Sequence, residues 1–154
     1  PPGTGDVQMG LAKMLPRAEM IIVTTPAGNA QKVAARVADM GRKNFLRIVG
    51  VIENMSEFVA PDGSRHALFG RGGGQALADD VGVPLLGAVP IESVVSEGGD
   101  IGEPAALGEG AAAEVIRSIA KAIAEEHVPP VEMAGCSARM LDAAVAALDG
   151  LDLS

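Results

Sequence analysis

Residues 46–52 (LRIVGVI) are the stretch that decides the fold, because they form a short apolar run rich in β-branched residues. Such a run is typical of a strand that is buried on both faces of a parallel sheet. Residues 20–25 (MIIVTT), which end at Pro26, and residues 84–89 (PLLGAV), which end at Pro90, have the same character. The sequence therefore predicts a sheet of buried strands.

Stretches with helical spacing separate these runs. Apolar residues recur every three or four positions after Asn29, which we expect to cap a helix, and polar side chains occupy the opposite face. The sequence predicts a short helix over residues 75–80 and a longer helix over residues 111–125. A long turn is expected over residues 96–107. Since parallel strands need crossover helices, this order predicts an α/β fold with an open, mostly parallel sheet and helices on both faces.

Composition and charge exclude several classes of protein. The chain has 154 residues, 48% of them hydrophobic and 21% charged, which is typical of one globular domain. Its net charge of −8 argues against a dedicated nucleic-acid binder and against docking on anionic membranes. The single cysteine, Cys136, excludes an intramolecular disulfide and a multi-cysteine metal site within one chain. Without Trp or Tyr, the core is expected to be aliphatic.

The ends of the predicted strands are where a ligand is expected, because open α/β sheets bind ligands beyond the carboxyl ends of their strands. The chain itself opens on PPGTGD over residues 1–6, without an initiating Met, and we expect it to be a fragment that begins just after a further strand. Glycines there permit close approach of the backbone to a phosphate. The predicted strands end, in order, in Thr24, Thr25 and Pro26, in residues 53–56 (ENMS), and in Pro90, Ile91 and Glu92.

Six motifs, taken in order, resemble the Mrp/ApbC family of P-loop ATPases, which carry iron–sulfur clusters and are related to MinD and ParA. The resemblance covers residues 1–126 and implies that residues 1–127 are the C-terminal portion of a P-loop ATPase domain in a cytoplasmic protein. Residues 128–154 would then be an acidic tail. The motifs are PPGTGD (1–6), TTP (24–26), GVIENMS (50–56), FGRGGG (69–74), VPLLG (83–87) and EGGD (97–100).

The resemblance also implies roles for individual residues around ATP and Mg²⁺. Asn54 corresponds to the residue that hydrogen-bonds the adenine edge, for which an amide offers both a donor and an acceptor. The alternative for Asn54 is a turn former that bonds its own backbone. Pro90, Ile91 and Glu92 correspond to the segment against the adenine ring, and Thr25 and Pro26 to a strand end beside the pocket. The switch-like loop that senses the γ-phosphate corresponds to Pro2, Gly3, Thr4, Gly5 and Asp6.

Two departures from the family pattern limit what this chain is expected to do. It contains no Gly-x-x-x-x-Gly-Lys-Ser/Thr loop, so we expect no catalytic residue, weak ATP binding and no hydrolysis by the chain as given. Ala60 and Gly63 stand where many members carry a Cys pair, so no metal ligand is expected there, and Asp62 and His66 are weak substitutes. Asp62 and Gly63 instead predict a hairpin turn. The run 72–74 (GGG) is either a flexible turn or a weak phosphate cradle.

Three functions from different classes follow. The first is an Mrp-type ATPase that acts as a homodimer and delivers iron–sulfur clusters to client apoproteins. The second is a MinD/ParA-like regulatory ATPase without cluster cargo, which the missing cysteines favour. The third is a catalytically inactive interaction module. Within the tail, residues 137–148 have the spacing of an amphipathic helix, an unstructured tail being the alternative, and Cys136 is expected to be an inert thiol.

Overall fold

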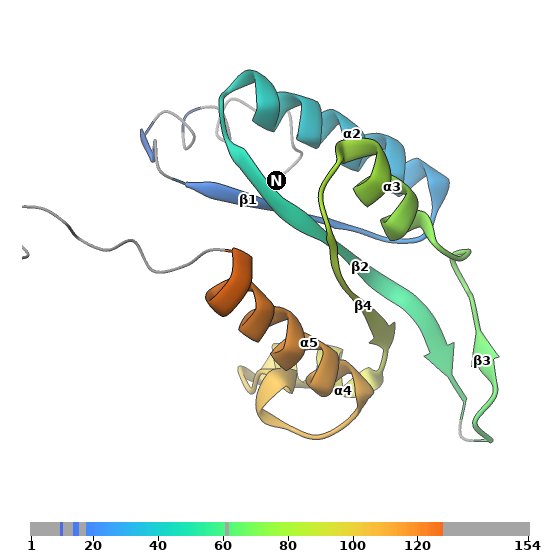
Figure 1. Cartoon of the computed structure of the whole chain (residues 1–154). Helices are drawn as coiled ribbons and strands as arrows, with labels where there is room; N and C mark the ends of the chain where they lie inside the picture. The colour runs from blue at the N-terminus through green and yellow to red at the C-terminus, as the bar shows by residue number, and fades with distance from the viewer. Residues whose placement is uncertain (1–9, 11–13, 16–17, 61, 128–154) are drawn as a thin grey trace, which may run out of the picture.

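The computed structural model describes residues 10, 14–15, 18–60 and 62–127. Within them, a parallel sheet is formed by β1 (Glu19–Thr24), β2 (Arg47–Val59) and β4 (Leu85–Ile91), in the order β1–β2–β4. The short β3 (Arg65–His66) pairs antiparallel with the end of β2. The open, mostly parallel sheet predicted from the sequence is therefore confirmed (Figure 1).

Helices cover both faces of this sheet (Figure 1). The crossover helices α2 (Gly28–Lys43) and α3 (Gly73–Val81) lie on one face, because successive strands are added in the same direction and parallel connections keep one hand. The opposite face carries α4 (Ser93–Ile101), the short 3₁₀ turn η1 (Ala105–Leu107) and α5 (Ala111–Ala122), which continues as a π-type turn (Ile123–His127). After β4, the chain therefore changes from one layer of helices to the other.

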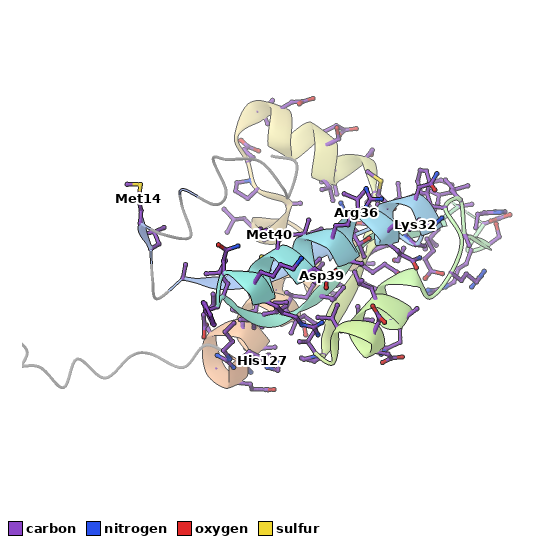
Figure 2. All side chains as sticks on the ribbon, turned by 90° about the horizontal axis from the view of Figure 1, so that it is seen from above. Met14, Lys32, Arg36, Asp39, Met40 and His127 are labelled. Carbon is purple, nitrogen blue, oxygen red and sulfur yellow. The ribbon has the colours of Figure 1, made fainter. Side chains whose placement is uncertain are left out.

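Each layer of helices has an aliphatic core of its own, as the composition predicts. Under α2 and α3, the buried residues are Ile22, Ala34, Ala38, Val51, Leu77, Ala78 and Val81. Under α5, they are Val89, Ala112 and Ile119, with partly buried neighbours that include Ile52 and Leu86. The small alanines bring the helices close to the sheet, and Figure 2 shows the polar side chains Lys32, Arg36 and Asp39 on the outer side of α2.

The first strand differs from the prediction in its burial. Ile22 and Thr24 are buried beneath the α2 layer, but Val23 between them is 59% exposed. Side chains alternate along a strand, so Val23 belongs to the opposite face. On that face, α5 packs against β4 rather than against β1. The prediction of burial on both faces is therefore wrong for β1 in the described part of the chain.

Two helix predictions are also corrected. Asn29 lies within the first turn of α2, and the N-cap position is held by Ala27, which makes no side-chain capping bond. The region expected to be a long turn over 96–107 contains most of α4 and all of η1. Gly98 and Gly99 suggested a turn, but both are part of the α4 helix.

The second strand is longer than predicted, because β2 continues past Ile52 to Val59 and enters a hairpin with β3 that extends away from the sheet (Figure 1). The predicted turn is confirmed, with Gly63 at a φ of 83°. Its flanking pairs are Phe58 with His66 and Val59 with Arg65. No helix among the described residues is long and apolar enough to cross a membrane.

Candidate functional site

A crevice is expected where β2 and β4 end, because the chain leaves these neighbouring strands toward opposite faces of the sheet. After β2 and its hairpin the chain enters α3 on one face, and after β4 it enters α4 on the other (Figure 1). Such a switch point is where open α/β sheets bind ligands. The register pairs Thr24 with Glu53 and Asn54 with Val89, so the predicted site residues of three strand ends lie along one edge.

The hydrogen-bonded ladder between β2 and β4 is interrupted at this edge. The register shifts between Asn54 and Phe58, opposite Pro90, which has no N–H to donate. Met55 adopts a left-handed conformation with φ 56°, which is uncommon for a residue with a side chain. Bulges and such backbone conformations concentrate next to functional sites.

Asn54 is half-buried at the edge of this interruption. Its Oδ1 accepts a hydrogen bond from the Met55 N–H at 3.0 Å. This is the local backbone contact expected of a turn-forming asparagine. This bond uses the amide oxygen of Asn54, and the Nδ2 donor takes no part in it.

Thr25 and Pro26 lie next to this edge and join it to the start of α2. The Thr24 hydroxyl donates to the Thr25 carbonyl at 3.3 Å, and Gln31 Nε2 donates to the Pro26 carbonyl at 2.7 Å. Gly73 packs against the same place, because a Cβ added there would lie 1.9 Å from Gln31 Nε2 and 2.6 Å from the Pro26 oxygen.

Glu53 is a buried carboxylate at the last residue of β2 that pairs with β1. It is 6% exposed, and its Oε2 accepts the Gly74 N–H at 2.5 Å in the first turn of α3. The negative charge lies at the positive end of the α3 dipole, which is a favourable arrangement. A Cβ on Gly74 would approach the Cβ of Glu53 to 2.6 Å. Gly73 and Gly74 are therefore the packed start of α3, with Gly72 as its N-cap, rather than a flexible turn.

Glu92 accepts hydrogen bonds from the first turn of α5, as Glu53 does from the first turn of α3. Its two carboxylate oxygens accept the N–H groups of Ala111 and Ala112 at 3.1 and 3.2 Å. Gly110 precedes them with φ 115°, and a Cβ there would meet Glu92 Oε2 at 2.8 Å. The side chain predicted to face adenine is thus hydrogen-bonded to the start of a helix.

Sequence reasoning missed the capping function of both glutamates. Glu53 was part of a recognised motif, and Glu92 part of a predicted site, but their partners lie 21 and 19 residues further along the chain. Two features of the sequence could have indicated this function. Glu53 and Glu92 each directly follow an apolar run, and about 20 residues later a glycine, Gly72 or Gly110, precedes a helix. Helix starts of this kind need an acceptor for their free N–H groups.

The tip of the hairpin contains Ala60 and Gly63, the positions at which a cysteine pair was expected from the family pattern. The backbone closes the turn through Ala60 N–H to Ser64 O and Gly63 N–H to Ala60 O, both at 2.8 Å. Asp62 Oδ1 accepts the Ser64 hydroxyl at 2.6 Å and the Ser64 N–H at 2.9 Å. The Ser64 hydroxyl, and then the Ser64 backbone, lower the pKa of Asp62 because they stabilise its charged form.

His66 extends this arrangement, with its Nε2 at 2.9 Å from the Ser64 hydroxyl oxygen. Even so, no group of three or more His, Cys, Asp or Glu side chains suited to hold a metal ion occurs among the residues that the structure describes. Pro2 to Asp6 and Cys136 lie outside those residues.

Comparison with known proteins connects this geometry to one family. The family model described as ParA: NUBPL iron-transfer P-loop NTPase matches residues 1–124. The iron–sulfur cluster carrier protein of Deinococcus radiodurans is 45% identical over 127 residues, which cover 80% of this chain and 36% of the relative. That of Mycobacterium leprae is 44% identical over 113 residues, which cover 70% of this chain and 30% of the relative. The chain thus spans about a third of these curated relatives.

Solved structures with the same fold include two nucleotide-dependent proteins. A nucleotide-binding protein from Archaeoglobus fulgidus in complex with ADP superposes with a TM-score of 0.54 at 28% identity, over 67% of this chain and 43% of that one. The cell division ATPase MinD of Pyrococcus furiosus superposes with a TM-score of 0.53 at 25% identity, over 68% of this chain and 41% of that one.

Proposed function

Because the chain belongs to the ParA/NUBPL family of iron-transfer P-loop NTPases, we propose that it forms the adenine-facing part of the ATP site in an iron–sulfur cluster carrier. The observation that carries this proposal is the switch point between β2 and β4. Asn54 and the segment from Pro90 to Glu92 lie on its two sides. A crevice of this kind is the ordinary ligand site of the fold.

In this proposal, Asn54 exchanges its bond to the Met55 N–H for the edge of adenine. The amide oxygen accepts from the adenine amino group, and the amide nitrogen donates to a ring nitrogen. Pro90 and Ile91 supply an apolar surface for the ring, while Glu92 keeps this segment attached to α5. Thr25 and Pro26 bound the pocket on the side of β1.

The phosphates and Mg²⁺ are assigned to other parts of the protein. The loop of Pro2, Gly3, Thr4, Gly5 and Asp6 is proposed to respond to the γ-phosphate and to change conformation on hydrolysis. A P-loop lysine is needed to offset phosphate charge, and the chain has no such motif. ATP hydrolysis is therefore proposed for a protein that contains a P-loop in addition to the present chain.

The test is an NMR titration of the full chain with ATP, which detects weak binding, with GTP as the comparison. We expect ATP to shift the amide signals of Asn54 and Ile91. Replacing Asn54 by Ala should weaken ATP binding about 5- to 150-fold, since one polar pair contributes about 1–3 kcal/mol. Asn44→Ala is the matched control, because Asn44 follows α2 and precedes β2, at the other end of the sheet. Equal affinity of the wild type and Asn54→Ala would contradict the role of Asn54.

Cluster delivery is the second part of the proposal, with the cluster as cargo held between the two subunits of a homodimer and passed to client apoproteins. Its support is the similarity to curated cluster carriers. The hairpin tip itself does not fit a cluster, because Ala60 and Gly63 have no thiolate to offer. That observation favours a second candidate, a regulatory ATPase of the MinD kind without cargo.

Anaerobic reconstitution with iron and sulfide distinguishes the two candidates. A carrier should gain the visible absorption of an iron–sulfur cluster, and Cys136→Ser should abolish it if the one thiol of each subunit is the ligand. ATP binding without any such absorption would favour the regulatory ATPase.

A further inference from the structure

A groove of about 440 Å³ lies between α4 and η1, on the sheet face opposite α2 and α3. Its wall is mainly apolar, with Val94 and Ile101 from α4 and with Pro104, Ala105 and Leu107 from the segment that follows. None of the residues assigned to the nucleotide site lines it. The groove is therefore a separate feature of the fold.

Large aliphatic side chains at this groove remain open to solvent. Ile101 is 70% exposed and Leu107 is 85% exposed, and Val94 beside them is also exposed. Single exposed aliphatic residues are common on protein surfaces, but several gathered around a concave surface are typical of an interaction site. A partner that covers them would bury apolar area without any rearrangement of the core.

The groove is held in its shape by contacts that do not depend on a ligand. Gly98 packs against the chain after α4, because a Cβ there would lie 2.3 Å from the Glu103 carbonyl oxygen. The Glu103 N–H donates to the Gly98 carbonyl at 2.8 Å. Arg117 of α5 donates to the carbonyls of Ala106 and Gly108, both at 2.8 Å. A preformed surface loses little conformational entropy on binding.

The charge around the groove indicates what kind of partner fits. Residues 93–110 contain no Lys or Arg, and their acidic side chains Glu97, Asp100, Glu103 and Glu109 are all exposed. Arg117 of α5 adds one positive charge, which is hydrogen-bonded to the Ala106 and Gly108 carbonyls. Because the acidic side chains outnumber it, charge complementarity selects a cationic partner. The tail of this chain is an unsuitable occupant, because residues 128–154 contain four acidic residues against the single basic Arg139.

We propose that this groove docks an amphipathic segment of a partner protein. The segment inserts aliphatic side chains against Ile101 and Leu107 and places Lys or Arg beside Glu97 and Glu103. The proposal does not depend on nucleotide binding, since it uses a different set of residues. Helical segments with one apolar face are a common ligand of such grooves.

The test measures binding of two labelled peptides to the full chain by fluorescence anisotropy. Both peptides are helices of roughly 15 residues with Leu on one face, and the other face carries either Lys or Glu. We expect saturable binding of the Leu/Lys peptide alone. Ile101→Ser and Leu107→Ser should each weaken it about fivefold or more, as for the loss of one buried aliphatic side chain. Val33→Ser on α2 is the matched control and should leave it unchanged.

Two pairs of charge variants separate the groove from general attraction to an acidic chain. Glu97→Gln with Glu103→Gln should weaken binding, while Asp79→Asn with Asp80→Asn on α3 changes the net charge equally and should not. All these side chains are exposed, so the variants are expected to fold, and thermal melts check this. Equal weakening by both pairs, equal binding of the Leu/Glu peptide, or indifference to Ile101→Ser and Leu107→Ser would each overturn the proposal.

Discussion

Gly74 is the residue at which one added methyl group has a predictable effect. Its position against Glu53 leaves 2.6 Å for a Cβ, whereas Gly99 in α4 has open space around the same position. We expect Gly74→Ala to lower the free energy of unfolding by about 1–3 kcal/mol through overpacking. Gly99→Ala should raise it by up to about 1 kcal/mol, because alanine favours helix. Urea denaturation measures both, and a rise in both variants would contradict the contact with Glu53.

Asp62 gives a prediction about pH. Its pKa lies below the ordinary value because the Ser64 hydroxyl and N–H stabilise the carboxylate. A lowered pKa in the folded state means that the contribution of this contact is complete above the ordinary Asp pKa and is lost as the pH falls through the lowered one. The hairpin turn should therefore loosen in acid.

The measurement for Asp62 is an NMR titration of its carboxyl carbon. Ser64→Ala should move the pKa of Asp62 upward, toward the ordinary value, while Ser118→Ala on α5 should leave it unchanged. An unchanged pKa in Ser64→Ala would show that the serine does not hold the carboxylate.

At the scale of elements, α5 depends on a side chain from the end of β4. Glu92 accepts the first N–H groups of α5, so Glu92→Ala leaves them without this acceptor. We expect a loss of about 1–2 kcal/mol in the free energy of unfolding. Amide hydrogen exchange should become faster at Ala111 and Ala112. Glu114→Ala, in the same first turn, is the control and should have the smaller effect.

The elements that the sequence predicted correctly are those with a local signal. The apolar run at 46–52 and the spacing in α2 and α5 reflect burial, so these elements were found, although β2 continues past the predicted run to Val59. Helix α4 was missed because its glycines were interpreted as a turn, whereas Gly98 lies in the helix and leaves room for the Glu103 carbonyl just beyond it. The predicted site residues of three strand ends do lie along one edge of the sheet. The contact of Glu53 with Gly74 depends on folding across the hairpin, which no local pattern records.

For the whole molecule, the two layers of helices share one sheet and should unfold together. Leu77 lies in the core beneath α2 and α3, and Ile119 in the core beneath α5. We expect Leu77→Ala and Ile119→Ala each to cost about 2–5 kcal/mol, while the exposed Val33→Ala stays within about 0.5 kcal/mol. Both should lower the midpoint of one urea transition followed by far-UV circular dichroism. Two separated transitions in either variant would contradict this coupling.

The net charge of −8 is unevenly distributed over the molecule. Helix α2 carries the basic residues Lys32, Arg36, Arg42 and Lys43 against one acidic residue, Asp39. Figure 2 shows Lys32, Arg36 and Asp39 on its outer side. The segment from 93 to 110, on the other face of the sheet, contains acidic residues and no Lys or Arg. Oppositely charged partners are therefore steered to opposite faces of the same domain.

Glu53 and Glu92 compete with any external anion for the N–H groups at the starts of two helices. Each carboxylate already occupies a helix start, Glu53 that of α3 and Glu92 that of α5, and the two helices belong to opposite layers. A phosphate or carboxylate that arrives at either start must displace a tethered group at high effective concentration. A strong anion bound at one of these helix starts would break the hydrogen bond between the glutamate and the helix. Anion binding at this edge would therefore weaken the attachment of that helix layer to the sheet.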